Sequence, residues 1–214
     1  AAYQGNLINE IAAASLIGYW KMNGNANDSS GNANNGTLMA GAALYGAGMP
    51  VLTMDRFGRA GMAYHFDHGG NIEVPYKTAL NPQQMSISLW CKKDTVGRTW
   101  APDTYTLVSL DRWHGYKFQF QGTNRSFFTV RTIRPAGDTN YINQDANISY
   151  DSLGWRHIVA TYKPGEMDFY VNGTLTKSWT GTDAPGNPIT VDNAINFIIG
   201  QDLPTDKYTT SLSD

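Results

Sequence analysis

The stretch "EMDFYVNGTLTKSWTG" at residues 166–181 decides the fold class, because it has the pattern of a β-hairpin. Apolar and more polar side chains alternate over residues 166–171, which is the period of a strand with one buried face. Asn172-Gly173 follows, and this dipeptide favours the tight turn that joins two antiparallel strands. The sequence therefore predicts a hairpin whose second strand begins at Thr174.

The same period of two recurs along the chain, and glycine, proline and asparagine interrupt it every eight to twelve residues. Further predicted strands are "MSISLWCKK" at 85–93, "GYKFQFQG" at 115–122 and "AINFIIG" at 194–200. Strands with one apolar face must pack in pairs of sheets, and no alternation of strand and helix is visible. We therefore predict an all-β, antiparallel two-sheet sandwich.

Helical periodicity is confined to the start of the chain. Residues 7–15, "LINEIAAAS", fit one short helix or a linker. The segments 94–104 and 181–193 are rich in turn-forming residues and are expected to be long surface loops.

Composition limits the function classes. The 214 residues suffice for one large β domain, and the net charge of −2 provides no basic field for nucleic acid or an anionic membrane. Cys91 is the only cysteine, so no internal disulfide forms. The longest apolar run, residues 11–20, is shorter than the ~20 residues that span a bilayer, so no membrane insertion is expected.

Three stretches in a fixed order carry a family resemblance. They are "GYWKMNGNANDSSGNANNGTL" at 18–38, "DRFGRAGMAYHFD" with "NIEVP" within 55–75, and "WRHIVATYKPGEMDFYVNG" at 155–173. The predicted strand at 85–93 lies between the second and the third. Together they resemble the laminin-G-like, concanavalin A-like jelly-roll domains of secreted bacterial proteins, over roughly residues 16–202. We accordingly expect a linker or short helix at 1–15 and one jelly-roll domain at 16–214.

The resemblance implies a curved double sheet, a calcium ion in many members, and binding of glycans or other surface ligands. Many members are attached to larger carbohydrate-processing proteins, which implies an extracellular, cell-surface or periplasmic location and further domains as partners. One departure is visible. The family usually closes with an acidic and apolar strand that pairs with the first strand, and the sequence stops at "YTTSLSD" without one.

The loop "NDSSGNANNG" at 27–36 is the candidate metal site. Calcium prefers six to eight hard oxygen ligands, and this loop offers carboxylate and amide oxygens on a backbone that glycines allow to bend. Asp28 and Asn34 are the predicted ligands, and in the family this loop resembles one side of a structural calcium site. The alternative is a solvated turn held by hydrogen bonds from side chains to the backbone.

Glycoside hydrolases share this fold, and they need two carboxylates that face each other across a sugar. Their signature on this fold is a Glu-x-Asp-x-x-Glu strand. Glu166 and Asp168 match its beginning, but Val171 replaces the final Glu. The same stretch also matches the non-catalytic hairpin of laminin-G-like domains, so no catalytic residue is predicted.

Exposed aromatic rings stack on the C–H faces of sugars, and polar side chains bind the hydroxyls. Trp100 and Trp113 lie in polar loops and are the predicted ligand-binding aromatics, with Asp111, Arg112 and His114 beside the second ring. The alternative is that both rings cover the open ends of the sandwich. The remaining tryptophans of the family-like strands are expected to be framework residues: Trp20, Trp90 and Trp155.

The sequence thus favours a non-catalytic, calcium-stabilised carbohydrate-binding module whose partner is a glycan or polysaccharide. A structural or adhesion module that binds protein, for instance by strand addition at the first strand, is the alternative from another class. A divergent glycoside hydrolase is the third possibility.

Overall fold

A computed structural model describes residues 15–43, 46–93, 104–112, 114–121, 125–133, 139–145, 154–180, 189 and 195–204. The strands are β1 (Thr37–Met39), β2 (Val51–Thr53), β3 (Ala63–His65), β4 (Asn71–Val74), β5 (Met85–Cys91), β6 (Thr104–Leu110), β7 (Tyr116–Gln121), β8 (Arg125–Ile133), β9 (Thr139–Asp145), β10 (Arg156–Lys163), β11 (Glu166–Val171), β12 (Thr174–Thr180) and β13 (Phe197–Ile199). One short 3-10 turn covers Thr78–Leu80, and the described part of the chain holds no α-helix.

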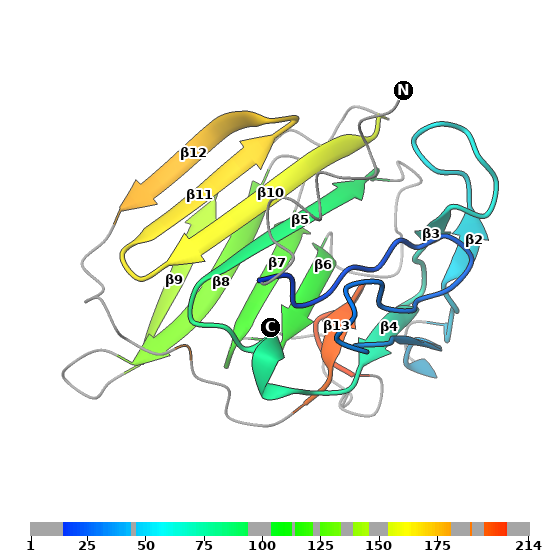
Figure 1. Ribbon diagram of the computed structural model, residues 1–214, viewed down its shortest axis with the longest axis horizontal. Helices are drawn as coiled ribbons and strands as arrows, with labels where there is room; N and C mark the ends of the chain where they lie inside the picture. The colour runs from blue at the N-terminus through cyan, green and yellow to red at the C-terminus, as the bar shows by residue number, and fades with distance from the viewer. Residues whose placement is uncertain are drawn as a thin grey trace.

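The strands form two packed sheets and a small hairpin. A seven-stranded sheet runs in the order β1-β4-β13-β6-β7-β8-β9, and a four-stranded sheet in the order β12-β11-β10-β5. Every pairing is antiparallel. In Figure 1 the four-stranded sheet lies across β6–β9 of the larger sheet, and the β2–β3 hairpin stands at one side. This arrangement confirms the predicted all-β antiparallel sandwich.

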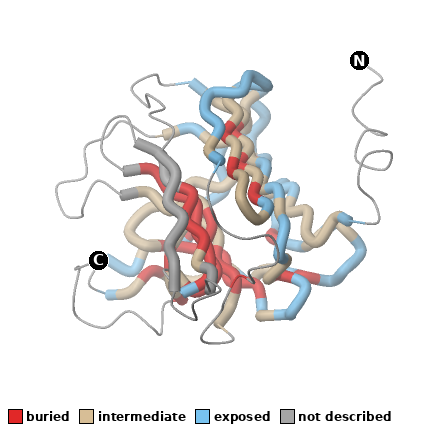
Figure 2. The backbone as a smooth tube through the Cα atoms, turned by 90° about the vertical axis from the view of Figure 1, so that its left-hand side faces the viewer, coloured by how far each residue is buried: buried red, intermediate tan, exposed pale blue. Residues whose placement is uncertain are grey.

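Aromatic residues join the two sheets. Phe118 and Phe128 lie opposite each other on β7 and β8, and both rings contact Phe169 of β11 in the other sheet. The centroid of the Phe169 ring is 5.8 Å from that of Phe118 and 6.4 Å from that of Phe128, at steep interplanar angles. All three side chains are fully buried, and Figure 2 shows buried residues concentrated where strands face each other.

The predicted strands are confirmed with small changes at their ends. β5, β7 and β11–β12 coincide with the predicted segments, and the late strand is shorter, at Phe197–Ile199. The β11–β12 turn has positive φ at Asn172 (50°) and Gly173 (82°), as the Asn-Gly dipeptide predicts. Residues 1–14, 94–103, 181–188 and 190–194 lie outside the described residues, so the predicted helix and most of both predicted loops remain predictions.

The first strand-like segment forms almost no ladder. Of residues 16–24, only Trp20 makes a β-bridge, with Asp28. None of the strand ladders among the described residues includes this segment. The Trp20 indole instead stacks on Phe197 of β13, with ring centroids 5.5 Å apart, so this segment is held to the core by its side chain.

The seven-stranded sheet also has buried residues on the side that points away from the four-stranded sheet. One row of paired residues on that side runs through Glu73, Ile198, Ser109, Lys117 and Thr129. All five are buried, and Lys117 is only 1% exposed. Burial lowers the pKa of Lys117 to about 8, although the nearby Asp202 carboxylate opposes the shift.

Lys117→Met should change how stability depends on pH. The pKa of Lys117 is lower in the folded protein than its ordinary value of 10.5, so between pH 8 and 10.5 the unfolded chain binds more protons. The free energy of unfolding of the wild type should therefore rise relative to the variant across this window, by on the order of 2–3 kcal/mol. Denaturant unfolding of both proteins at several pH values measures the difference, and parallel curves would contradict it.

Candidate functional site

The loop of residues 27–36 is organised around the Asp28 carboxylate. Oδ1 accepts hydrogen bonds from the backbone N–H groups of Tyr19 (2.9 Å) and Ser30 (2.8 Å). Oδ2 accepts from the Ser30 hydroxyl (2.7 Å) and the backbone N–H of Asn34 (2.9 Å). Burial alone would raise the pKa of Asp28, but these hydrogen bonds outweigh it and hold the pKa below its ordinary value. One carboxylate thus ties both arms of the loop to the first segment of the chain.

Asn34 is the second predicted metal ligand, and it is 1% exposed. Its Nδ2 donates to the carbonyl of Ile17 (2.7 Å), whereas its Oδ1 is buried and has no hydrogen-bond partner. A buried acceptor without a donor is costly, and a bound cation would satisfy it. Asp28 and Asn34 therefore fit a calcium site in part. The side-chain oxygen of Asn34 is free, whereas the two carboxylate oxygens of Asp28 already accept four hydrogen bonds.

A lysine from outside the loop already binds two of its backbone carbonyls. The Lys77 ammonium donates to the carbonyls of Asn32 (2.8 Å) and Ala33 (3.1 Å). Among the residues that the structure describes, no group of three or more His, Cys, Asp and Glu side chains is placed to hold a metal ion. A calcium ion at this loop would depend on amide and carbonyl oxygens beside the single carboxylate of Asp28.

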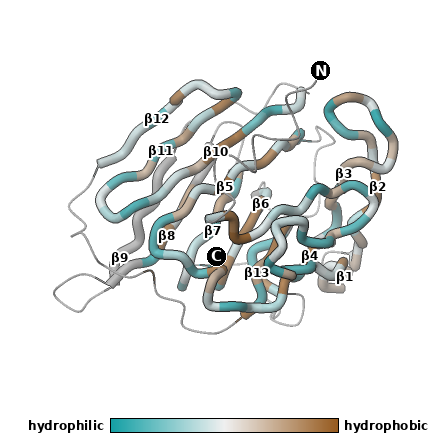
Figure 3. The backbone as a smooth tube through the Cα atoms, in the orientation of Figure 1, coloured by the Kyte–Doolittle hydropathy of each residue, from teal (hydrophilic) through white to brown (hydrophobic). Residues whose placement is uncertain are grey.

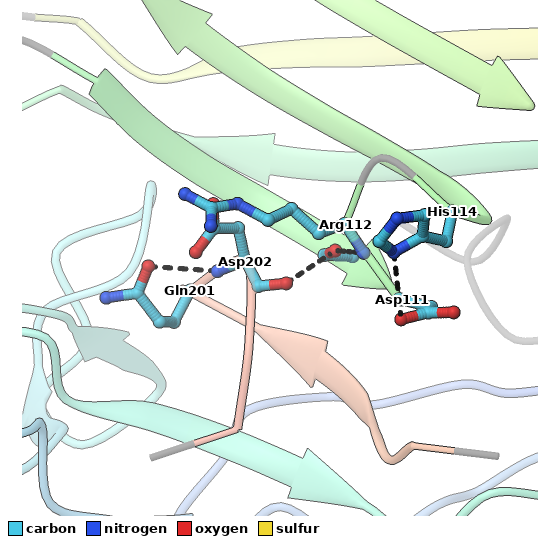
Figure 4. A network of polar contacts seen from close by, with 6 residues as sticks. Asp111, Arg112, His114, Gln201 and Asp202 are labelled. Carbon is cyan, nitrogen blue, oxygen red and sulfur yellow. Dashed lines mark hydrogen bonds and ion pairs between the residues drawn. The ribbon is translucent and has the colours of Figure 1, made fainter. Parts of the chain in front are cut away.

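The predicted ligand-binding residues Asp111, Arg112 and His114 lie together in the tight β6–β7 turn (Figure 4). Asp111 and Arg112 both have positive φ, at 57° and 52°, which is unusual for residues with side chains. Arg112 Nε is 2.8 Å from Oδ2 of Asp202, and the backbone N–H of Arg112 donates to the Ser109 hydroxyl. The cluster therefore couples this turn to the segment after β13.

The three side chains differ in accessibility. Asp111 is buried, Arg112 is held by its ion pair, and His114 has an exposed side chain whose Nδ1 is 3.8 Å from Asp111. Trp100 and Trp113 lie outside the described residues, so the predicted stacking at this turn remains a prediction. Of the three described residues of the predicted set, His114 has the side chain most open to a ligand.

A second polar and aromatic surface lies on the outer face of the four-stranded sheet. The alternation of β5 is as predicted: Met85, Ile87, Leu89 and Cys91 are partly buried, and Ser86, Ser88 and Trp90 are exposed. Apolar and hydrophilic residues alternate along β10 and β11 as well (Figure 3). We call the following residues the outer face: Ser86, Ser88, Trp90, His157, Thr161, Asp168 and Tyr170.

Trp90 is the main aromatic side chain of the outer face, and it is 44% exposed. His157 lies opposite it on β10, and the two rings stack with centroids 5.2 Å apart. The imidazole is held in turn, because its Nε2 is 2.8 Å from the Ser88 hydroxyl. Trp90 therefore presents a large ring at a fixed orientation beside hydroxyl groups.

Trp90 was expected to be a framework residue, and its side chain is exposed. Family-like position placed it in a core strand, but the period of two puts its side chain on the face opposite Leu89 and Cys91. That alternation was visible in the sequence and was the signal for an exposed ring. Arg56 of the β2–β3 connection also contacts the Trp90 ring, with its guanidinium carbon 4.4 Å from the ring centroid. This contact had no such signal, because Arg56 lies in a different hairpin.

The two carboxylates that resemble part of a glycosidase signature lie on one face of β11, as predicted. Glu166 Oε2 makes an ion pair of 3.0 Å with Lys163, and Asp168 lies opposite Thr161 and Ser178. The position of the third signature residue is Val171. The described part of β11 thus supplies two carboxylates at successive outward positions of the same strand, rather than a pair on opposite sides of a sugar.

A groove of about 1720 Å³ runs between β5 and residues 15–22. Its lining includes Val108, Tyr116 and Phe197 of the core, and the inward side chains of β5 are only partly buried. β5 pairs with β10 alone among the described strands, so one backbone edge faces the groove. The volume exceeds the ~300–1,000 Å³ of small-molecule pockets.

Sequence comparison agrees with this architecture. Residues 66–214 match the family described as the concanavalin A-like lectin/glucanases superfamily, of the laminin G type. The chain belongs to this superfamily. No curated protein matches the chain by sequence.

Several solved structures share the fold. Domain 4 of AbnA, an extracellular arabinanase from Geobacillus stearothermophilus solved with arabinotriose, has a TM-score of 0.57 and 18% identity, over 86% of this chain and 82% of that domain. The receptor-binding domain of botulinum neurotoxin mosaic serotype C/D has a TM-score of 0.54 and 18% identity, over 84% of this chain and 41% of the toxin domain. The botulinum neurotoxin DC binding domain in complex with SialylT has a TM-score of 0.50 and 18% identity, over 82% of this chain and 40% of the toxin domain. At this identity the likeness concerns the fold.

Asp28→Ala should destabilise the domain by about 1–3 kcal/mol, because four donors lose their shared acceptor. The pKa of Asp28 is held low, so its contribution to stability is present above the ordinary value of 3.8 and declines as pH falls below it. Urea unfolding measures the change. The matched control is Asn25→Ala, an exposed side chain that accepts one hydrogen bond, from Asn27. Equal effects of the two substitutions would contradict the central role of Asp28.

Proposed function

We propose that this chain is a non-catalytic carbohydrate-binding domain of a secreted or cell-surface bacterial protein, with its binding site on the outer face of the four-stranded sheet. The observation that carries the proposal is the exposed Trp90 ring, fixed by His157 on a sheet whose neighbouring side chains carry hydroxyls. An aromatic ring offers the apolar surface that a sugar ring needs, and Ser86, Ser88 and Thr161 offer hydrogen bonds to its hydroxyls. No helix in the described part of the chain is long and apolar enough to cross a membrane.

Relatives of the fold support the class of ligand. The arabinanase domain was solved with arabinotriose and a toxin binding domain with SialylT, and both share the two-sheet architecture. Rigidity supports the site, because a ring that is already ordered loses little conformational entropy when a ligand binds. The proposal of a non-catalytic role rests on Val171, which stands where the glycosidase signature has its last carboxylate.

Trp90→Ala should reduce the affinity for the glycan by roughly tenfold or more, because it removes the aromatic ring on which the sugar would stack. Affinity gel electrophoresis against plant, microbial and host polysaccharides measures it. The matched control is Leu175→Ala, an exposed apolar residue on β12.

A parallel variant, Trp113→Ala, separates the two candidate sites. Loss of binding in Trp113→Ala but not in Trp90→Ala would move the site to the β6–β7 turn. Retention of binding in both variants would contradict aromatic stacking at either place. Absence of binding to every glycan by the folded wild type would overturn the proposal.

Calcium is proposed as a stabiliser of the 27–36 loop, with Asp28 and Asn34 as ligands. Bound calcium would supply positive charge to the buried Oδ1 of Asn34 and to the Asp28 carboxylate. EDTA should then lower the melting temperature of the wild type, and calcium should restore it. Asn34→Ala should melt at a lower temperature that does not respond to EDTA. An unchanged melting temperature of the wild type in EDTA would contradict the proposal.

Binding of an extended protein segment is the second candidate function. The observation in its favour is the groove beside β5, where a backbone edge lies next to the partly buried inward side chains of that strand. A strand with apolar residues at every second position would pair with this edge and cover the core, which is recognition by strand addition. Two results together would favour this function. The folded domain would bind no glycan, and the groove-facing amides of β5 would gain hydrogen-exchange protection when such a peptide is added.

A further inference from the structure

Arg56 lies over two exposed aromatic rings. Its guanidinium carbon is 4.4 Å from the centroid of the Phe57 ring and 4.4 Å from that of the Trp90 ring. Phe57 is 58% exposed and Trp90 is 44% exposed. Arg56 belongs to the connection between β2 and β3, so this contact links the small hairpin to the outer face of the four-stranded sheet.

The guanidinium of Arg56 has no carboxylate partner within the described residues. The adjacent Asp55 is already engaged: its Oδ2 lies 2.7 Å from Nε and 2.6 Å from Nη2 of Arg59. Its Oδ1 accepts the backbone N–H groups of Phe57 and Arg59. A guanidinium that stacks on aromatic rings keeps its N–H donors in its own plane, where they remain available to a planar or multidentate anion.

His157 provides a second polar group beside this donor set. Its ring stacks on Trp90, and its backbone N–H donates to Oδ1 of Asn172 (3.0 Å). The imidazole and the Arg56 guanidinium both contact the Trp90 ring. Burial lowers the pKa of His157, and the positive charge of Arg56 lowers it further. An anion bound to Arg56 would therefore lie near the imidazole as well.

We propose that Arg56, Trp90 and His157 bind an acidic glycan, with the anionic group on the Arg56 guanidinium and the sugar ring against Trp90. This inference rests on the proposed function and names its ligand class. The anionic group is a carboxylate or a sulfate ester, since both present the oxygens that the in-plane N–H donors of arginine recognise. The exposed part of the Trp90 indole contacts the apolar face of the same or the next sugar.

Three polysaccharides test the ligand class: polygalacturonate carries carboxylates, dextran sulfate carries sulfate esters, and dextran is neutral. Affinity electrophoresis and calorimetry with the whole 214-residue chain should show binding to an anionic polymer at least tenfold tighter than to dextran. The anionic polymer that binds more tightly identifies the charged group. Equal affinity for dextran and both anionic polymers would overturn the inference.

Two variants test the role of Arg56. Arg56→Gln removes the charge, and it should lower the affinity for the anionic polymer at least tenfold with an unchanged melting temperature. Arg56→Lys keeps the charge but loses the planar donor set, and it should lower the affinity by a smaller factor. Lys177→Gln is the matched control, because it removes one positive charge from an exposed position on β12.

The outcomes separate this inference from the proposed function. If Arg56→Gln binds acidic polymers as tightly as the wild type, and Trp90→Ala loses binding, the acidic-ligand inference is overturned. Glycan binding by this domain would then stay in place. A reduction in Lys177→Gln equal to that in Arg56→Gln would also overturn the inference, because the effect would then come from net charge alone. Failure of the wild type to bind any of the glycans would overturn both.

Discussion

The contact of Phe169 with Phe118 and Phe128 is the interaction on which the rest of the structure depends. It joins the four-stranded sheet to the seven-stranded sheet through three fully buried rings at steep angles, a geometry that aromatic pairs favour. Once these inner faces are fixed, the period of two fixes the direction of every other side chain on the same strands. A shift of β11 by one residue would place Asp168 in the core and Phe169 in solvent.

The same constraint orients the outer face. Leu89 and Cys91 pack toward the core, so Trp90 between them must point outward, and the register of β5 with β10 brings His157 directly opposite. Stacking of these two rings and the contact with Arg56 then follow from side chains whose backbone positions are already fixed. The outer face thus gains a preorganised aromatic surface from the packing of the opposite face.

Much of the fold could be predicted from the sequence, because its signals are local. The alternation at 85–91 and the Asn172-Gly173 turn each specify their own strand or hairpin. The site was harder to predict, because its residues come from β5, β10 and the β2–β3 connection, and no local pattern encodes their proximity. The buried row with Lys117 was also beyond local patterning, since a polar residue opposite an apolar face is ordinarily assigned to solvent.

The two candidate functions use different directions of the same strand. Side chains of a strand stand perpendicular to the sheet, whereas its backbone N–H and C=O groups point within the plane of the sheet. Trp90 therefore lies at the candidate ligand surface on the face of β5, and the unpaired edge of β5 presents backbone groups to the groove. A segment added at that edge would bury Leu89 and Ile87 more fully, and it would lie beside the outer face, because Ser88, Trp90 and His157 also line the groove. The two candidate ligands would therefore approach adjoining surfaces of one strand.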